Sequence, residues 1–521
     1  MERQLFVKIS KPSYEYDVNS IVRAFYPDRL VKVLTDESRS LWEEYRRLNV
    51  SAGLPTEISE ENASERMKAE EADFEEIEIE LLDTGASMKM LTEGKQPELL
   101  GAVYEWQWEP GAASDSGDYK AGFKTFLYKT LEVHTGKSLP WGNLTGIRPT
   151  KIAYGMLEDG KEDREIRSYL QKKYFVSEEK ADLGIGIAKR ERALLSRIHY
   201  EGGYSLYIGI PFCPTTCLYC SFTSFPIAMY RKKVEDYIDC LIRELEYVSR
   251  IYADKILDTV YIGGGTPTTL EPDQLDRLLR HVREKFSFSE VKEFTVEAGR
   301  ADSITREKLE VLKRYGVTRI SVNPQTMKQE TLDFIGRRAS VTQVLEAYRL
   351  AREIGFDNIN MDLILGLPGE TEEDVQHTID KVTELAPDSL TVHSLAIKRA
   401  SRLNQWIREN GIEMLSNTDE TMRIAAEGAA RLGMEPYYLY RQKNMSGNFE
   451  NVGYALPGKY GLYNILIMEE VQTIVACGAG TISKRVYPDG RIERCDNVKD
   501  VQLYIEKIDE MIERKKQLLA E

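Results

Sequence analysis

The chain has few cysteines, and this scarcity bears on where it works. Six cysteines in 521 residues are too sparse for a disulfide scaffold. A reducing compartment fits best, and we therefore expect a cytoplasmic protein. Residues 1–9 also lack the apolar core and the cleavage site of a secretory signal peptide.

Long apolar runs and an excess of positive charge are also missing. No apolar run reaches about 18 residues, so no membrane-spanning helix is expected. The 70 Lys and Arg residues are outnumbered by 85 Asp and Glu residues, and the net charge of −15 argues against a nucleic-acid surface as the main site. We find no sequence repeat of fixed period. The remaining class is a globular protein of roughly two to four domains.

Residues 1–200 are expected to form an N-terminal α+β domain. Alternating apolar and polar residues predict strands at 5–9, 88–91 and 102–108, and a helical pattern runs from 119 to about 198. The Glu-rich stretch 57–80 is interpreted as a solvated or mobile acidic segment.

From residue 201 the pattern changes to alternating strands and helices. Six strands are expected at 206–210, 259–262, 293–296, 319–322, 358–364 and 389–392, with helices near 228–252, 272–286, 303–315, 341–354 and 371–385. This pattern predicts a parallel α/β array over 201–400, either closed into a barrel or left as an open arc. Residues 401–521 begin with a helical pattern and are expected to form a separate, mostly helical capping domain.

Three of the six cysteines, Cys213, Cys217 and Cys220, follow the first strand of this array with the spacing C-x3-C-x2-C. Three thiolates suit a cubane iron–sulfur cluster in which one iron lacks a cysteine ligand. That iron can bind a small molecule, so the cluster is interpreted as a reagent. Structural zinc usually takes four ligands from paired C-x2-C units, and no second pair is present. A zinc site and three buried free thiols remain the alternatives.

A glycine-rich turn follows the second predicted strand. Three consecutive glycines remove Cβ atoms, so that a ligand can approach the backbone N–H and C=O groups. A plain strand-to-helix turn is the alternative, and the nearby cysteines favour ligand binding. The turn comprises Gly263, Gly264, Gly265, Thr266 and Pro267.

Together these motifs resemble the radical S-adenosylmethionine (SAM) superfamily, and within it the oxygen-independent coproporphyrinogen III oxidase family. The resemblance covers roughly residues 200–480 and implies a partial (β/α)6 barrel similar to a TIM barrel. The long N-terminal part is similar to that of the HemZ-like branch, which is related to HemN and HemW. The segments that carry the resemblance are 207–222, 263–268, 319–325, 336–337 and 360–369.

The resemblance implies two cofactors, a [4Fe–4S] cluster and SAM, and it implies a role for each matching residue. Cys213, Cys217 and Cys220 match the cluster ligands. In this family SAM binds the open iron, and a reduced cluster splits its sulfonium to give a 5′-deoxyadenosyl radical. Tyr207 matches a tyrosine that hydrogen-bonds the SAM carboxylate, and Glu297 matches a carboxylate near the sugar and amine of SAM; these two are the catalytic candidates. The other matches to SAM contacts are Tyr219, Gly263 to Pro267, Gln325, Arg337 and Asp362.

Each of these residues also has an ordinary structural interpretation. Glu297 could be a solvated carboxylate at a strand end, and Arg337 could pair with a surface acid while Arg338 takes its role. Asp362 lies in the apolar run 359–365, where an ionised carboxylate is costly unless it is paired or hydrogen-bonded. A functional role is therefore favoured for Asp362.

The substrate side is less defined. A tetrapyrrole with four carboxylates needs cations and apolar walls. One candidate clamp follows the sixth strand and the other lies in a Tyr-rich stretch, although each could be an exposed surface; they comprise Lys398, Arg399, Arg402, Arg441 and Lys443. His393 is interpreted as an ordinary polar residue.

Two positions depart from the family pattern. Characterised oxidases carry a further cysteine two residues after the triplet, where this chain has Phe222. The heme-chaperone branch carries a His-Asn pair in the tail, and the matching stretch at 462–464 lacks histidine.

The resemblance implies oxidative decarboxylation of coproporphyrinogen III to protoporphyrinogen IX without oxygen. A hydrogen atom would leave a propionate β-carbon, and loss of CO2 and one electron would leave a vinyl group, twice per substrate. The expected partners are a tetrapyrrole and reduced flavodoxin or ferredoxin as electron donor. The alternatives are a heme-binding or heme-trafficking protein of the same family, a radical SAM enzyme for another tetrapyrrole, and a plain electron carrier.

Overall fold

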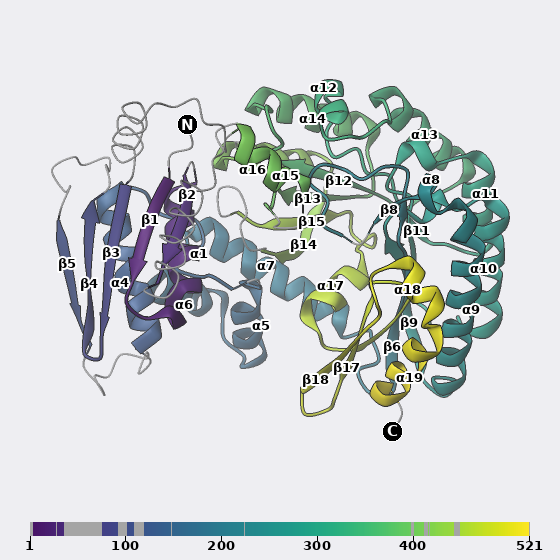
Figure 1. The fold of residues 1–521 in the computed structure, drawn as a ribbon, viewed down its shortest axis with the longest axis horizontal. Helices are drawn as coiled ribbons and strands as arrows, with labels where there is room; N and C mark the ends of the chain where they lie inside the picture. Colours follow the sequence, from purple (N-terminus) through teal and green to yellow (C-terminus); the bar gives the residue numbers. More distant parts are fainter. Residues whose placement is uncertain are drawn as a thin grey trace, which may run out of the picture.

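The computed structural model describes residues 4–27, 29–35, 75–91, 102–108, 119–146, 148–222, 224–397, 401–410, 415, 417–441 and 449–519. A small N-terminal sheet and a large arc of strands and helices lie at opposite ends of the molecule (Figure 1). A group of helices joins them.

The N-terminal sheet has the strand order β2-β1-β3-β4-β5. Its strands are β1 (Gln4–Ile9), β2 (Leu30–Leu34), β3 (Glu75–Leu82), β4 (Gly85–Leu91) and β5 (Val103–Gln107). Helices α1 (Glu15–Phe25) and α4 (Tyr119–Thr135) supply buried apolar side chains to the same core cluster as the strands. The predicted strands at 5–9, 88–91 and 102–108 are confirmed.

The interpretation of the Glu-rich stretch was wrong for residues 75–80. Residues 57–74 lie outside the described residues, but 75–80 belong to β3, which pairs with β1 on one side and β4 on the other. Ile77 and Ile79 are buried because they alternate with the glutamates and face the core. Lys8 on β1 pairs with Glu76 and Glu78 on the other face, which offsets part of the acidic charge.

Six parallel strands form the arc, in the order expected from the sequence. Each strand pairs in parallel with the next one. They are β6 (Gly203–Ile210), β9 (Ile256–Gly264), β10 (Glu293–Glu297), β11 (Arg319–Ser321), β12 (Ile359–Leu365) and β13 (Ser389–Ser394). The expected partial barrel is therefore confirmed.

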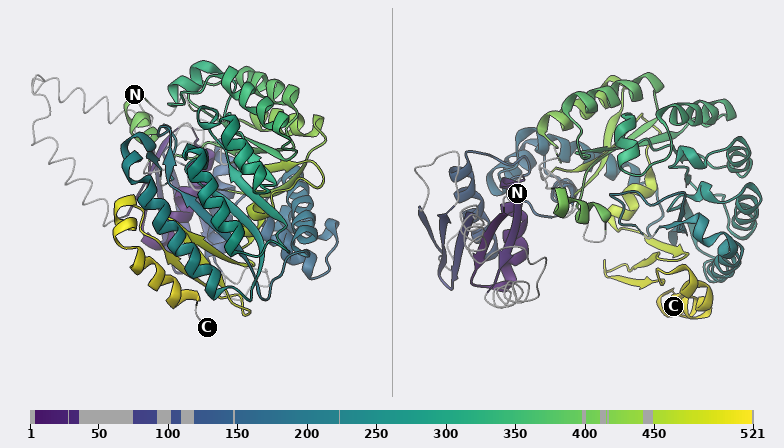
Figure 2. Two further views of the ribbon diagram at one scale, coloured as in Figure 1. Left: turned by 90° about the vertical axis from the view of Figure 1, so that its right-hand side faces the viewer. Right: turned by 45° about the horizontal axis from the view of Figure 1, so that its top comes forward.

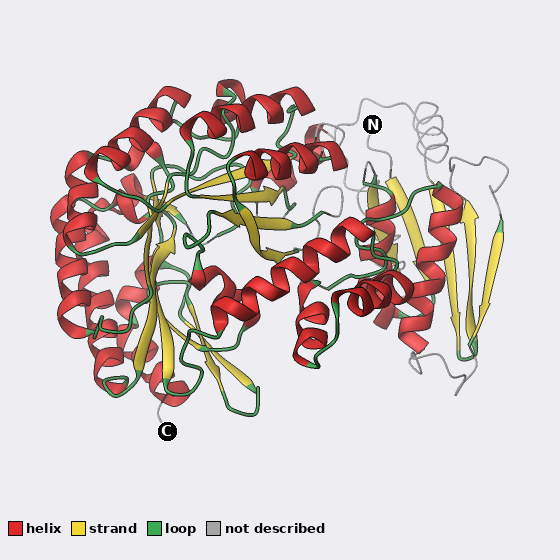
Figure 3. Cartoon of the chain, turned by 180° about the vertical axis from the view of Figure 1, so that it is seen from behind, coloured by secondary structure: helices red, strands yellow, loops and turns green. Residues whose placement is uncertain are grey.

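The outer layer of the arc consists of helices, as Figures 1 and 3 show. They are α9 (Val234–Ile251), α10 (Pro272–Lys285), α11 (Arg306–Arg314), α13 (Val341–Ile354) and α14 (Glu372–Leu385). Local signals set their ends: α13 begins with a reciprocal capping box between Ser340 and Gln343 and ends at Gly355 in the left-handed conformation.

The C-terminal segment extends this sheet at both edges instead of standing apart from it. On one side, β15 (Asn451–Ala455) pairs antiparallel with β13, and β14 (Glu435–Tyr440) pairs with β15. On the other side, β16 (Thr473–Cys477) pairs parallel with β6 and is followed by β17 (Ile482–Val486) and β18 (Ile492–Asp496). The segment from residue 401 thus contains strands as well as helices, because the edge strands of the arc need hydrogen-bonding partners.

Helices α5 (Thr150–Glu158), α6 (Asp163–Tyr174) and α7 (Glu178–Leu195) connect the two ends of the molecule, as the right-hand view of Figure 2 shows. Their buried side chains belong to the same apolar cluster as the arc, and α7 packs against β14. Trp141 Nε1 and Lys180 Nζ both donate to the Glu450 carboxylate, at 2.7 and 2.8 Å. Part of the predicted N-terminal domain is thereby bound to the arc.

None of the described helices combines the length and the apolarity needed to cross a membrane.

Helix α19 (Ile508–Leu519) closes the C-terminal end through a buried ion pair. Lys515 Nζ lies 2.7 Å from Glu244 Oε1 on α9, and both side chains are fully buried. Tyr504 and Asn497 also donate to the Glu244 carboxylate, at 2.6 and 2.7 Å. The buried charges are therefore satisfied as a group.

Replacing Lys515 with Met is expected to lower the free energy of unfolding by about 3–5 kcal/mol, because Glu244 loses its counter-charge while it remains buried. Urea denaturation of the protein measures this. Lys161→Met, which breaks the exposed Lys161–Glu165 pair, is the matched control and should change the free energy by at most ~1 kcal/mol. Equal effects of the two substitutions would contradict the assignment of the buried pair.

Candidate functional site

The predicted site residues gather at the carboxyl ends of the parallel strands. The cysteine loop follows β6, the glycine turn follows β9, and Glu297 ends β10. Gln325 follows β11, and Asp362 lies in β12. Because parallel strands share one direction, these ends meet at one edge of the arc, where barrels of this kind place their chemistry.

The three sulfur atoms lie in one short loop next to the glycine turn. Cys213 ends a two-residue strand, β7 (Phe212–Cys213), which pairs with β8 (Phe225–Pro226). Cys217 is buried, and none of the three thiols forms a disulfide. Burial is the largest of the causes that raise the pKa of Cys213 to about 11, and the nearby Cys220 and Cys217 contribute to this rise. The thiols are therefore close enough to influence one another.

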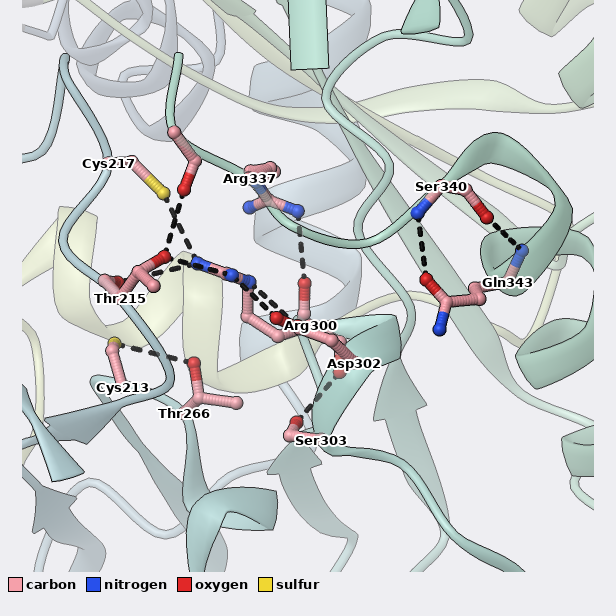
Figure 4. A network of polar contacts seen from close by, with 12 residues as sticks. Cys213, Thr215, Cys217, Thr266, Arg300, Asp302, Ser303, Arg337, Ser340 and Gln343 are labelled. Carbon is pink, nitrogen blue, oxygen red and sulfur yellow. Dashed lines mark hydrogen bonds and ion pairs between the residues drawn. The ribbon is translucent and has the colours of Figure 1, made fainter. Parts of the chain in front are cut away.

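Each sulfur has a polar group beside it, as Figure 4 shows for the first two. Cys213 Sγ lies 3.4 Å from Thr266 Oγ1, and Arg300 Nη1 donates to Cys217 Sγ at 3.5 Å. Cys220 Sγ lies 3.8 Å from Ser224 Oγ. Donors placed at sulfur suit thiolates that bind metal, because they stabilise the negative charge.

This donor set fits a cluster better than a single ion. Zinc would need a compact set of usually four ligands. Three thiols from one loop, with donors at the sulfurs, are the ligands expected of a cubane cluster with one open iron.

The glycine turn is fixed against the cysteine loop by its backbone. Gly265 N donates to Ile210 O at 2.8 Å, and Thr266 N donates to Phe212 O at 2.7 Å. Gly264 has φ of +106°, a conformation open mainly to glycine. A Cβ at Gly265 would lie 2.5 Å from Phe212 O, so a larger residue would displace the strand that leads to Cys213. The two motifs therefore form one unit.

Glu297 is a half-buried carboxylate at the edge of this unit. Tyr261 donates to Glu297 Oε1 at 2.6 Å. A Cβ at Gly263 would lie 2.8 Å from the Glu297 carboxyl carbon, so the missing side chain leaves room for that carboxylate. Loss of solvation raises the pKa of Glu297 to about 7. The interpretation as a solvated strand-end carboxylate is not supported, because Tyr261 and Gly263 enclose the carboxylate.

Tyr207 belongs to a stack of three tyrosines inside the arc. Its ring stacks on Tyr261 with centroids 6.0 Å apart, and Tyr261 stacks on Tyr463 at 4.5 Å. Tyr463 comes from α17 (Leu462–Glu469), whose first backbone N–H donates to Glu293 at the start of β10. The Tyr207 hydroxyl lies 3.3 Å from the position of a Cβ at Gly264. Helix α17 thus packs against Tyr261, two residues before the glycine turn.

Gln325 and Asp362 lie together through their backbones. Gln325 N donates to Asp362 O at 2.9 Å, and Gln325 has φ of 70°, which is unusual for a residue other than glycine. Asn323 and Asn360 donate to the Asp362 carboxylate, each at 2.7 Å. Burial alone would raise the pKa of Asp362, but the nearby His393, 3.9 Å away, and hydrogen bonds from neighbours such as Asn360 lower it. Asp362 is thus an ionised, half-buried carboxylate.

Arg337 and Tyr219 also lie together at this edge. Arg337 Nη2 donates to Tyr219 Oη at 3.2 Å, and Arg337 Nη1 donates to Gly299 O at 3.3 Å. Its guanidinium is buried, and its Nε atom has no hydrogen-bond partner among the described residues. The interpretation of Arg337 as a surface ion-pair residue is therefore not supported, whereas the neighbouring Arg338 is exposed.

Arg300 and Tyr463 are parts of the site that the sequence analysis did not identify. Arg300 lies three residues after Glu297, where only its position after a predicted strand could have suggested a role. Tyr463 lies in the stretch considered only for its lack of histidine. Its place in the stack depends on the packing of α17, which the local sequence does not reveal.

The residues of the two candidate substrate clamps differ in where they lie. Lys398, Arg399 and Lys443 lie outside the described residues. Arg402 donates to Thr216 O in the cysteine loop. Arg441 is buried and donates to Leu144 O at 2.6 Å, so it contacts the N-terminal part of the chain. His393 lies 3.9 Å from Asp362 and 3.3 Å from the Tyr440 hydroxyl, which agrees with an ordinary polar role.

Comparisons with known proteins agree with this geometry. The family model of the radical SAM superfamily matches residues 207–382. The chain is 41% identical over 390 residues to the oxygen-independent coproporphyrinogen-III oxidase-like protein HemZ of Bacillus subtilis, covering 74% of this chain and 78% of that protein.

Two further relatives differ in what their names describe. The heme chaperone HemW of Bacillus subtilis is 37% identical over 195 residues, covering 37% of this chain and 51% of that protein. An oxygen-independent coproporphyrinogen III oxidase of Salmonella typhimurium is 34% identical over 196 residues, covering 38% of this chain and 42% of that protein. The chain belongs to the radical SAM superfamily and, within it, to the coproporphyrinogen III oxidase-like family that includes HemN, HemW and HemZ.

Proposed function

We propose that the chain is an enzyme that decarboxylates coproporphyrinogen III oxidatively to protoporphyrinogen IX without oxygen, in the cytoplasm. As a member of its superfamily it uses a [4Fe–4S] cluster and SAM. The observation that carries the proposal is that three free thiols, a glycine turn and two half-buried carboxylates, those of Glu297 and Asp362, lie at one edge of the arc. The name of the HemZ relative, which covers most of both chains, supports the choice of reaction.

Cys213, Cys217 and Cys220 would hold the cluster, and the open iron would bind SAM. When bound, these cofactors supply a one-electron cleavage of the sulfonium that yields a carbon radical able to remove a hydrogen atom from substrate. The electron would come from reduced flavodoxin or ferredoxin, and a separate acceptor would take the last electron from substrate. The protein's own task is therefore to orient SAM and to keep water away from it.

The residues around the thiols divide that task. The turn from Gly263 to Pro267 offers backbone groups to the methionyl end of SAM, next to the Tyr207 hydroxyl. Glu297 would accept hydrogen bonds from SAM, and its negative charge attracts the sulfonium. Asp362, Gln325, Arg337 and Tyr219 would line the other side. The stacked rings of Tyr261 and Tyr463 would help to keep water out of the site.

Heme binding is the second candidate, because the HemW relative is a chaperone. The tail stretch that lacks histidine weakens this candidate, because Tyr463 packs there in the tyrosine stack. Phe222, in place of a further cysteine, weakens the oxidase in the same way. Heme binding is part of the test below.

Anaerobic protein loaded with iron and sulfide is expected to convert coproporphyrinogen III when SAM and reduced flavodoxin are supplied. Mass spectrometry should detect 5′-deoxyadenosine and a product lacking two CO2. Cys217→Ser should abolish both, because a cluster ligand is lost. Cys240→Ser, at a buried free thiol outside the site, should keep both. Stoichiometric heme binding without 5′-deoxyadenosine would contradict the proposal and favour the chaperone.

SAM affinity is expected to fall with acidity, because the pKa of Glu297 near 7 makes its carboxylate neutral in acid. The ionised fraction falls about tenfold from pH 8 to pH 6, and the Kd for SAM should rise by up to that factor. Equilibrium dialysis of the loaded protein measures it. Glu297→Gln should remove this part of the pH dependence, while Glu346→Gln on the outer helix α13 should retain it. Identical profiles for native protein and Glu297→Gln would refute the role.

A further inference from the structure

Arg300 is a buried cation that reaches into the cysteine loop from the end of β10. Its exposed fraction is 3%, and Asp302 accepts two hydrogen bonds from its guanidinium, at 3.0 Å from Nε and 2.8 Å from Nη2. This paired geometry fixes the plane of the guanidinium. The remaining nitrogen, Nη1, faces the loop (Figure 4).

The free side of the guanidinium contacts two residues of the loop. Nη1 donates to Cys217 Sγ at 3.5 Å and to Thr215 O at 3.4 Å. Nη2 donates to Thr215 Oγ1 at 3.1 Å, and the Thr215 hydroxyl in turn donates to Gly336 O at 2.9 Å. Arg300 thus joins the end of β10 to the cysteine loop, and Thr215 links that loop to the residue before Arg337.

Asp302 does not cancel the effect of Arg300 at the sulfur. The carboxylate binds the Nε and Nη2 edge, whereas Nη1 is the nitrogen nearest Cys217. The pair therefore presents its positive end to the sulfur and its negative end away from it. In a buried site such an oriented pair acts more strongly than it would in water.

We propose that Arg300 is a positioning residue that raises the reduction potential of the cluster through Cys217. The reduced cluster carries one more negative charge, and a cation with an N–H directed at a ligand sulfur stabilises that charge. A higher potential lets a weaker reductant deliver the electron. The proposal requires the cluster but not the choice of tetrapyrrole, so it stands or falls separately from the proposed reaction.

The test is a redox titration of the cluster-loaded protein, without SAM or porphyrinogen. Electron paramagnetic resonance monitors the reduced cluster and gives its midpoint potential. Arg300→Met removes the cation and its donors while it keeps a long side chain. Arg300→Lys keeps the charge but loses the two-pronged contact with Asp302. The expected order of midpoint potentials is native, then Arg300→Lys, then Arg300→Met as the lowest. We expect the equilibrium constant for reduction to fall about tenfold in Arg300→Met, a shift of ~59 mV for one electron.

Two measurements separate tuning from a general structural effect. Iron and sulfide content should match the native protein in each variant whose potential is compared. Arg352→Met on α13, where Arg352 binds Asp388 at 2.6 Å, makes the same chemical change away from the cysteines and should leave the potential unchanged. If Arg300→Met does not hold a cluster, the midpoint potential of Arg300→Lys is compared with that of the native protein instead. A variant with full iron content and the native potential would overturn the proposal.

Discussion

The arrangement of the site depends on the backbone hydrogen bonds between the segment after β6 and the turn after β9. Gly265 and Thr266 donate to Ile210 and Phe212, the residues that lead directly to Cys213. In the proposed site, three thiols from one loop would leave a cubane cluster one ligand short, and the adjacent glycine turn would offer its backbone to a ligand bound there. Under this proposal both motifs are needed, because the turn would supply part of the SAM site.

The rest of the fold supports this unit from three directions. Helix α17 packs Tyr463 against Tyr261, next to the glycine turn. Arg300 fixes the cysteine loop from the side of β10, and Arg337 with Tyr219 covers the neighbouring edge. Strands from the C-terminal segment complete both edges of the sheet. The site is therefore held by parts of the chain that are far apart in sequence.

Local patterns predicted the parts of the structure that depend on local chemistry. β-Branched runs gave the six strands, and cysteine spacing with consecutive glycines identified the two motifs. Patterns failed where distant partners decide the outcome. β3 was hidden by its glutamates, whose charge is partly offset by Lys8 on another strand. The strands after residue 401 were missed, and two of them, β15 and β16, have pairing partners in the arc. Arg300 was missed because only the fold brings it to Cys217.

The central claim is that one iron of a cluster held by Cys213, Cys217 and Cys220 binds SAM directly. The most direct measurement is pulsed electron–nuclear double resonance on the reduced, cluster-loaded protein with SAM labelled by 15N at its amine and 17O at its carboxylate. The account predicts magnetic coupling of both labels to the cluster, and loss of the cluster signal in Cys217→Ser. A full cluster that shows no coupling to either label would contradict it.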